Sequence, residues 1–208
     1  MKGTKSIGML FLAATAAFAG ETMNVAICNM GQVPAAVLEH AEAEAAYVFQ
    51  SVGVEIRWTN CGAEVDSPEA RMRPDFIVRA RDGGHINKVG RTSLEAMGRA
   101  FVSVDGTGRM ADVYYGAIRE LTLLWPITSA DQVMGYTMAH ELGHLLGARH
   151  RPNGLMRPAF GKKELDALNQ RRLKFNDWER ATIMQKLGAR KTASAANALI
   201  NGDPELHK

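Results

Sequence analysis

The chain has 208 residues, of which 46% are hydrophobic, 23% charged and 7% aromatic. This composition excludes a disordered polyelectrolyte and a fibrous protein, and the length suits one globular domain or two small ones. The net charge is only +3 and the basic residues are dispersed, which argues against a nucleic-acid partner.

The first segment of the chain has the pattern of a targeting sequence. Lys2 and Lys5 precede an apolar stretch over 7–18, and residues 17–19, Ala-Phe-Ala, fit the small-x-small pattern that signal peptidases cut. We expect a signal peptide over 1–19, export to the periplasm or medium, and a net charge of +1 once the two lysines are removed. The alternative is a membrane anchor, but about a dozen apolar residues are too few to cross about 30 Å of hydrocarbon. No later apolar run is longer, so we expect no stable membrane insertion.

Export changes the interpretation of the two cysteines. In an oxidising compartment Cys28 and Cys61 can pair, whereas a cytosolic thiol pool would keep them reduced. We predict one disulfide, worth roughly 3 to 4 kcal/mol on the chain-entropy account. The alternative is two buried free thiols.

The first part of the mature chain predicts a strand, a helix and a second strand. Residues 22–28 alternate between apolar and other side chains, which is the period of a strand. Over 33–50 apolar residues recur at three- and four-residue steps, and Pro34 suits a first helical turn. Residues 54–61 alternate again. This order implies a parallel, right-handed crossover.

Three further strands and two helices are predicted downstream. The strands are 75–80, 99–104 and 111–115, of which the last could instead begin a helix. Ser129 can cap a helix over 130–146 that Gly147 ends, and Asn176 can cap another over 177 to about 187. We expect one α+β domain over 20–190, followed by a flexible tail over 191–208.

Two histidines that one metal ion could share lie a single helical turn apart. The segment 140–144, His-Glu-Leu-Gly-His, places them four positions apart on the predicted helix. A catalytic zinc site uses three protein ligands and leaves a position for water. Gly147 can adopt the left-handed conformation that turns the chain, so that His150 returns to face the pair. We predict one Zn²⁺ held by His140, His144 and His150.

Glu141 has the chemistry of a general base. It points about 100° away from its neighbouring ligand around the helix, so we expect it to flank the ion rather than bind it. Zinc can lower the pKa of bound water to about 7, and Glu141 could take that water's proton and pass it to a leaving amine. The predicted reaction is hydrolysis of a peptide bond.

The pattern His-Glu-x-x-His-x-x-Gly-x-x-His over 140–150, followed by Met156, resembles the metzincin clan of zinc endopeptidases. The resemblance implies a twisted, mostly parallel sheet of about five strands with a backing helix, an active-site helix and a C-terminal helix. It also implies that Met156 lies in a tight turn beneath the metal. Arg151 follows the third histidine, where better-known subfamilies carry Ser, Asp, Glu or Pro, so no subfamily is assigned.

The same resemblance indicates where a peptide or protein substrate binds. The strand 99–104, if it lies at the sheet edge above the metal, would receive an extended peptide by strand addition. The expected substrate contacts are Ala100, Val102, Ser103 and Val104.

Two other functions stay open. One is a zinc-bearing module that binds a peptide or protein without turnover, and the other is a hydrolase of a non-peptide amide. A calcium requirement is undecided, because no Asp-x-Asp-x-Asp-Gly loop is present but scattered oxygens could form a site. We expect a monomer, and we expect His40, His85 and His207 to be structural or solvated.

Overall fold

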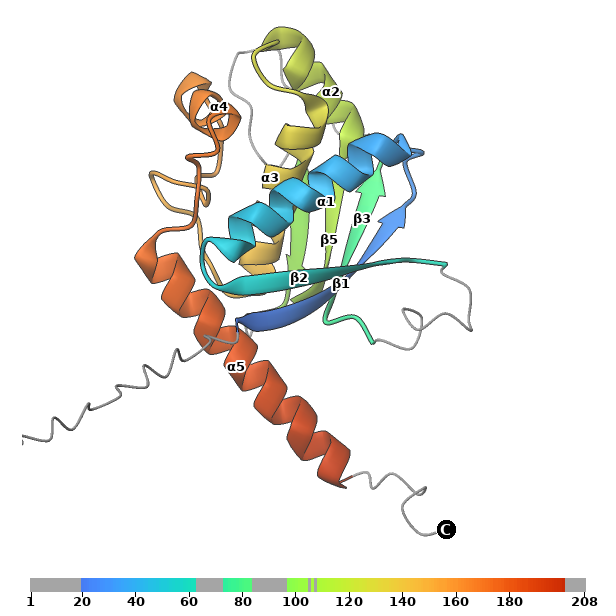
Figure 1. The fold of residues 1–208 in the computed structure, drawn as a ribbon, viewed down its shortest axis with the longest axis vertical. Coiled ribbons are helices and arrows are strands. Elements are labelled where there is room, and N and C mark those ends of the chain that lie inside the picture. The colour runs from blue at the N-terminus through green and yellow to red at the C-terminus, as the bar shows by residue number, and fades with distance from the viewer. Residues whose placement is uncertain (1–19, 63–72, 84–96, 105, 107, 201–208) are drawn as a thin grey trace, which may run out of the picture.

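A computed structural model describes residues 20–62, 73–83, 97–104, 106 and 108–200. The predicted signal peptide over 1–19, His85, His207 and the end of the predicted tail lie outside these residues. The elements of the described part follow in the order β1 (Glu21–Asn29), α1 (Ala35–Gln50), β2 (Val54–Asn60), β3 (Phe76–Arg81), β4 (Gly98–Val102), β5 (Gly108–Tyr114), α2 (Tyr115–Leu124), α3 (Ala130–Leu145), α4 (Lys162–Asn169) and α5 (Asp177–Ile200) (Figure 1).

The strands form one five-stranded sheet of order β2-β1-β3-β5-β4. β1 pairs in parallel with both β2 and β3, β3 pairs in parallel with β5, and β4 is antiparallel to β5. The parallel pairing of β1 with β2, which α1 connects, confirms that the predicted crossover is parallel. β4 is the last strand of the order, so among the described residues its outer edge pairs with no further strand. The predicted mostly parallel sheet is confirmed.

Helices α1 and α3 pack together on one face of the sheet (Figure 1). The buried side of α1 carries the apolar residues that recur at helical spacing: Leu38, Ala41, Ala45, Val48 and Phe49. α3 approaches α1 so closely at Gly135 that a Cβ there would lie 2.6 Å from the Ala41 carbonyl oxygen. Because α3 also packs against β4 and β5, most of its residues are buried. This packing fixes the helix that carries His140 and His144.

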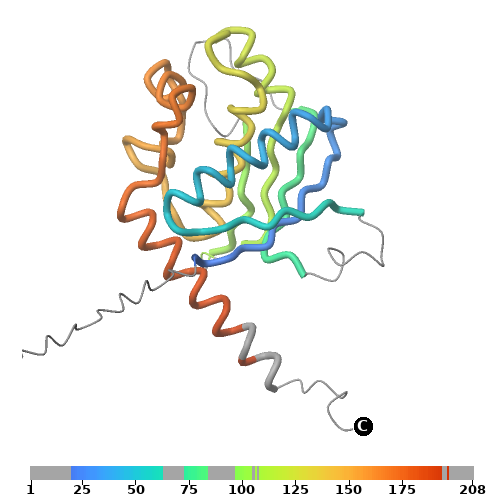
Figure 2. The backbone as a smooth tube through the Cα atoms, in the orientation of Figure 1, coloured from blue at the N-terminus to red at the C-terminus, as the bar shows by residue number. Residues whose placement is uncertain are grey.

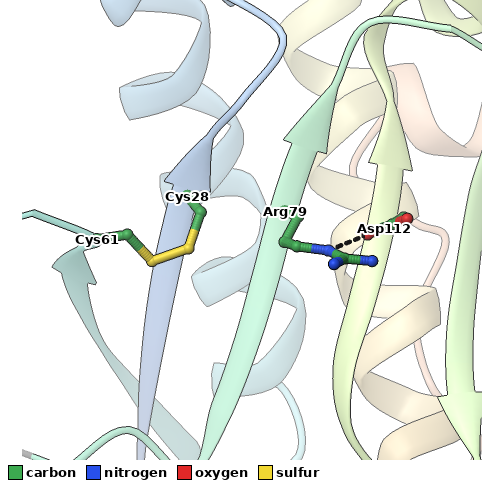
Figure 3. The surroundings of a disulfide bond; sticks show 4 residues. All are labelled: Cys28, Cys61, Arg79 and Asp112. Carbon is green, nitrogen blue, oxygen red and sulfur yellow. Dashed lines mark hydrogen bonds and ion pairs between the residues drawn. A yellow bond between two sulfur atoms is a disulfide. The ribbon is translucent and has the colours of Figure 1, made fainter.

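The opposite face of the sheet carries the disulfide and a buried ion pair (Figure 3). Cys28 of β1 is bonded to Cys61, just beyond β2, which confirms the predicted pairing. Beside it, Arg79 donates to Asp112 of β5 over 2.5 Å, and Arg81 donates to the second carboxylate oxygen over 3.2 Å. Asp112 is only 2% exposed, so the two arginines compensate a charge that would be costly to bury alone.

Two basic residues of helix α5 hydrogen-bond to the sheet. Arg190 donates to the Gly108 carbonyl oxygen over 2.6 Å, and Lys191 donates to the Glu21 carboxylate. Figure 2 shows α5 passing the start of β1, which it contacts. Among the described residues, no helix is both long and apolar enough to cross a bilayer.

The structure differs from the predictions at the ends of several elements and in one additional helix. The segment 111–115 is strand as far as Tyr114, and α2 then begins at Tyr115. The short helix α4 was not predicted, because its eight residues carry only a brief apolar pattern. The predicted helix end near 187 is wrong, because α5 runs to Ile200. The flexibility of the tail over 191–208 stays a prediction. Residues 188–200 contain no proline and several alanines, so the sequence there does not stop a helix.

Candidate metal centre

The start of α3 is set by Ser129, as predicted. The Gln132 side chain accepts a hydrogen bond from the Ser129 backbone nitrogen (3.5 Å), and the Ser129 side chain accepts from the Gln132 backbone nitrogen, so the two residues form a capping box. The four backbone N–H groups at a helix start lack partners within the helix, so such a cap stabilises that end. His140 and His144 lie more than two turns downstream, on a rigid and buried helix.

The end of α3 is set by Gly147, also as predicted. Gly147 has a φ of +86°, in the left-handed region that favours glycine. Its backbone nitrogen donates to the His144 carbonyl oxygen over 3.0 Å, and that of Ala148 donates to the Gly143 carbonyl oxygen over 2.9 Å. These two bonds form a Schellman motif, which ends the helix and reverses the chain. The reversal brings His150 back toward α3.

The three predicted ligands come together. The Nε2 atom of His144 lies 3.0 Å from Nε2 of His140 and 3.1 Å from Nε2 of His150. One ring nitrogen from each residue lies within 4.8 Å of the others, which is a group that could hold a metal ion. His140 is buried, His144 is half-buried and His150 is exposed, so the group opens to solvent on the His150 side.

Backbone carbonyl groups fix the tautomer of two rings. His140 Nδ1 lies 2.8 Å from the Leu155 carbonyl oxygen, and His144 Nδ1 lies 2.8 Å from that of Ala148. A carbonyl oxygen can only accept, so each Nδ1 carries the proton and donates it. Each Nε2 of the neutral rings then has a free lone pair directed at the centre of the group. Backbone oxygens that orient histidine in this way are common around metal sites.

Burial keeps the same two rings neutral. Burial, assisted by the neighbouring His144, lowers the pKa of His140 to about 3, against the opposing effect of the hydrogen bond to Leu155. Burial also lowers the pKa of His144, assisted by His150 and opposed by the hydrogen bond to Ala148. Neutral imidazole is the form that binds a metal ion, so the site is prepared for a cation at neutral pH.

The donor set fits zinc. Two nitrogen ligands 2.0 to 2.1 Å from a tetrahedral ion are separated by about 3.3 Å. The His144 nitrogen lies 3.0 and 3.1 Å from its two partners, close to that spacing. Lone pairs that face one another at this distance repel unless a cation lies between them. A group of three imidazole nitrogens fits the protein part of a catalytic zinc site.

Glu141 borders the same group of histidines, and its side chain packs against Gly98 of β4. It is 3% exposed, and with His140, His144 and His150 it lines a cavity of about 570 Å³. A Cβ built on Gly98 would lie 2.6 Å from Glu141 Oε1 and 2.8 Å from its Cγ. The absence of a side chain at Gly98 therefore makes the space that the carboxylate occupies.

Met156 lies under α3 in a turn that is anchored on both sides. A Cβ on Gly143 would lie 2.9 Å from Met156 Sδ and 3.0 Å from Phe175 Cε1, so Gly143 lets this turn approach the helix. Beyond Met156, Arg157 donates to the buried carboxylate of Glu164 over 2.5 Å. The geometry suits the methionine turn implied by the sequence, whose role in this chain stays a prediction.

Arg151, noted in the sequence as unusual, connects the third histidine to α5. Its guanidinium carbon lies 4.0 Å from the ring centroid of Trp178, and its backbone nitrogen donates to the Met156 carbonyl oxygen over 2.8 Å. Trp178 lies in the first turn of α5, where Asn176 Oδ1 accepts from the Glu179 nitrogen over 2.9 Å and caps the helix. The position of His150 is therefore tied to the C-terminal helix.

The expected substrate contacts lie along the edge strand and just beyond it. Ala100 borders the histidine cavity, while Val102, Ser103 and Val104 border a neighbouring hollow. Their binding of substrate stays a prediction. His40 lies apart from the site, 3.4 Å from a carboxylate oxygen of Asp131.

Sequence reasoning missed Gly98, Gly143 and Trp178. The glycines have negative φ and no local motif, since each is required only by a side chain distant in sequence. Trp178 was not connected to Arg151, because a contact between residues 27 positions apart leaves no local spacing signal. Only the departure at Arg151 from the better-known subfamilies marked this part of the site.

Comparison with known proteins supports the fold. No protein-family model and no curated protein matches the chain. Among solved structures it is similar to metalloproteinase-II from Bacteroides fragilis, with a TM-score of 0.50 and 15% identity over 83% of this chain and 55% of that one. It is also similar to an archaemetzincin from Methanopyrus kandleri (TM-score 0.48, 16% identity, 80% and 96% covered) and to myroilysin (0.34, 15%, 64% and 50%).

At this identity the shared feature is the fold, and the Bacteroides structure carries that conclusion. The chain spans about half the length of that metalloproteinase. The predicted α+β fold is confirmed, and it is similar to the fold of that metalloproteinase.

Proposed function

We propose that this chain is a zinc-dependent endopeptidase in which His140, His144 and His150 hold one Zn²⁺ and Glu141 is the general base and acid. The observation that carries the proposal is convergence on one cavity. Three imidazole nitrogens and one buried carboxylate border the same open space, and two of the imidazoles are locked in the tautomer that leaves Nε2 free.

Each component has a distinct part in peptide hydrolysis. Zinc, when bound, supplies a Lewis acid that lowers the pKa of water to about 7. The Glu141 carboxylate accepts a proton from the attacking water and then donates it to the leaving amine nitrogen. Gly98 positions that carboxylate, because any side chain there would displace it. The same carboxylate thus serves both proton transfers, first as the base and then as the acid.

The edge of β4 supplies a place for the substrate backbone. An extended peptide can add to an exposed sheet edge through main-chain hydrogen bonds. Ala100 borders the histidine cavity and Val102 lies further along the same edge, so a peptide paired there would pass the histidines. We propose that Ala100, Val102, Ser103 and Val104 hold the substrate in this way.

We also propose that the protein works outside the cytosol, secreted or in the periplasm. The signal-like segment over 1–19 supports export. The disulfide between Cys28 and Cys61 supports it independently, because such bonds persist in oxidising compartments.

The test exposes a diverse peptide mixture to the zinc-loaded mature protein and to its Glu141→Ala variant. New termini are identified by mass spectrometry, and bound metal is measured on the same samples. Both proteins should hold about one zinc per chain, and only the parent should produce new termini. If both hold zinc and neither cuts, the proposal is overturned in favour of a zinc-bearing binding module. A small non-peptide amide is assayed in parallel, and its hydrolysis by a parent that leaves all peptides intact would show that the reaction class is wrong.

A further inference from the structure

A second hollow adjoins the histidine cavity, with a volume of about 630 Å³. It lies between the end of β4, the turn after α3 and one side of α5. His144 borders both spaces, so a peptide that crosses the histidines extends directly into it. We call it the basic groove; its lining includes Val102, Val104, His144, Arg149, Gln185 and Lys186.

Two cations give the basic groove its charge. Arg149 follows the glycine turn that ends α3, and Lys186 lies on α5. Neither lies within 4.0 Å of a carboxylate oxygen of any described residue. No residue of the described lining is acidic. Asp105, between two segments of this lining, lies outside the described residues.

The neighbouring arginines, in contrast, are already engaged with the backbone. Arg190 donates to the Gly108 carbonyl oxygen over 2.6 Å, and Arg109 donates to that of Pro74, also over 2.6 Å. Their guanidinium groups contribute to local structure. Arg149 and Lys186 are therefore the cations that can meet an anion in the basic groove.

The direction of β4 decides which end of a substrate lies there. The strand begins at Gly98, against Glu141, and ends at Val102, in the lining of the basic groove. Antiparallel pairing is the commoner and slightly more stable arrangement. A peptide antiparallel to β4 runs from the Val102 end toward the Gly98 end. Residues N-terminal to the scissile bond then lie over the basic groove.

Building on the proposed endopeptidase function, we propose that the enzyme selects peptides with an acidic side chain on the N-terminal side of the scissile bond. Arg149 and Lys186 are the specificity-determining residues, and each forms an ion pair with a Glu or Asp carboxylate of the substrate. Partly exposed ion pairs are worth about 0.2 to 1 kcal/mol each, so one pair at the upper end corresponds to a preference of about fivefold and two pairs to at most about 30-fold.

The experiment measures kcat/KM for fluorogenic peptides built on a cleaved sequence from the mixture. The peptides differ only in carrying Glu, Gln or Lys at the positions immediately before the bond, and a second series varies those after it. We expect Glu to be preferred over Gln by about fivefold or more in the first series only, and the preference to fall with added salt. A preference confined to the second series, or no preference, overturns the proposal.

Variants assign the preference to the named side chains. Lys186→Gln with Arg149→Gln should bring the Glu-to-Gln ratio to about one, and Lys186→Glu should favour the Lys peptide. Arg180→Gln removes a charge from the opposite side of the same helix and should keep the ratio. If the double variant keeps the ratio, the assignment to Arg149 and Lys186 is wrong.

A binding readout separates this proposal from the proposed function. The zinc-loaded Glu141→Gln variant is titrated with the same peptides, fluorescently labelled, and followed by anisotropy. Acid-selective binding that Lys186→Gln together with Arg149→Gln abolishes, without cleavage by the parent, supports the basic groove and overturns proteolysis. Cleavage without acid-selective binding leaves the endopeptidase and overturns the groove. If the parent does not cleave and no acid-selective binding is seen, both the endopeptidase function and the role of the basic groove are overturned.

Discussion

The carboxylate of Glu141 occupies space that exists because Gly98 has no side chain. A Cβ on Gly98 would fall 2.6 Å from Glu141 Oε1 and 2.9 Å from Cδ, well inside van der Waals contact. Glu141 belongs to α3 and Gly98 begins β4, so helix and edge strand together set the position of the proposed base. The strand proposed to bind substrate also positions the group that acts on it.

Gly98→Ala should therefore impair catalysis while leaving the metal site intact. The added methyl displaces the Glu141 carboxylate, and small displacements of a catalytic group can reduce the rate by about 100-fold. We expect kcat/KM to fall by about 10- to 100-fold with about one zinc retained per chain. Gly188→Ala is the matched control, since a Cβ there meets no atom within 4 Å. Equal activities of the two variants would contradict the assigned role of Gly98.

The contact between Arg151 and Trp178 should affect how tightly zinc is held. Trp178→Ala removes a cation–π contact worth about 0.5 to 2 kcal/mol and frees the segment that carries His150. We expect zinc to be lost to a chelator several-fold faster, and Trp178→Phe to recover part of the difference. Competition with a chromogenic chelator measures this. An unchanged release rate in Trp178→Ala would show that α5 does not support the third ligand.

Gly143→Ala should destabilise the protein, although alanine is the better helix former. Alanine in a helix gains about 1 kcal/mol over glycine, whereas overpacking costs about 1 to 3 kcal/mol. The added Cβ would press on Met156 and Phe175, both buried. We expect a lower urea midpoint than the parent, whereas Gly188→Ala should raise it. A higher midpoint for Gly143→Ala would show that the methionine turn is not packed against the helix.

The metal-free protein should lose stability as the pH falls below about 6.5. A histidine in the unfolded chain takes up a proton near that pH, whereas burial lowers the pKa of folded His140 to about 3. The unfolded state then binds more protons between these values, so the free energy of unfolding decreases on acidification. The contribution of His140 is roughly 1 kcal/mol per pH unit.

Urea denaturation of the chelated protein at pH 7, 6 and 5 measures this slope, and His140→Gln isolates the contribution of this one residue. The slope of the variant should be shallower than that of the parent. Identical slopes would mean that His140 is not buried in its neutral form.

The sequence predicted most of the fold and the three histidines, but not all of the residues that position the metal site. The period of the apolar residues predicted the strands, α1 and α3, because an element that is buried on one face carries apolar residues at a regular spacing along the chain. The ligands were predictable because Gly147 and the three histidines form a helix end and turn, which depend on neighbouring residues. The roles of Gly98 and Trp178 were not predictable, because their partners Glu141 and Arg151 lie 43 and 27 residues away in the sequence and meet them only through tertiary packing. The length of α5 was missed, although no proline interrupts residues 188–200 and Arg190 and Lys191 hold that part of the helix to the sheet.

The most direct test of the central claim is a zinc titration of the chelated protein with peptide cleavage as the readout. Activity should be absent after chelation, should return in proportion to added zinc and should level off at about one equivalent per chain. His150→Ala, which removes one of the three nitrogen ligands, should need a large excess of zinc or fail to recover. Cleavage that persists without metal, or full recovery in His150→Ala at one equivalent, would contradict a three-histidine zinc endopeptidase.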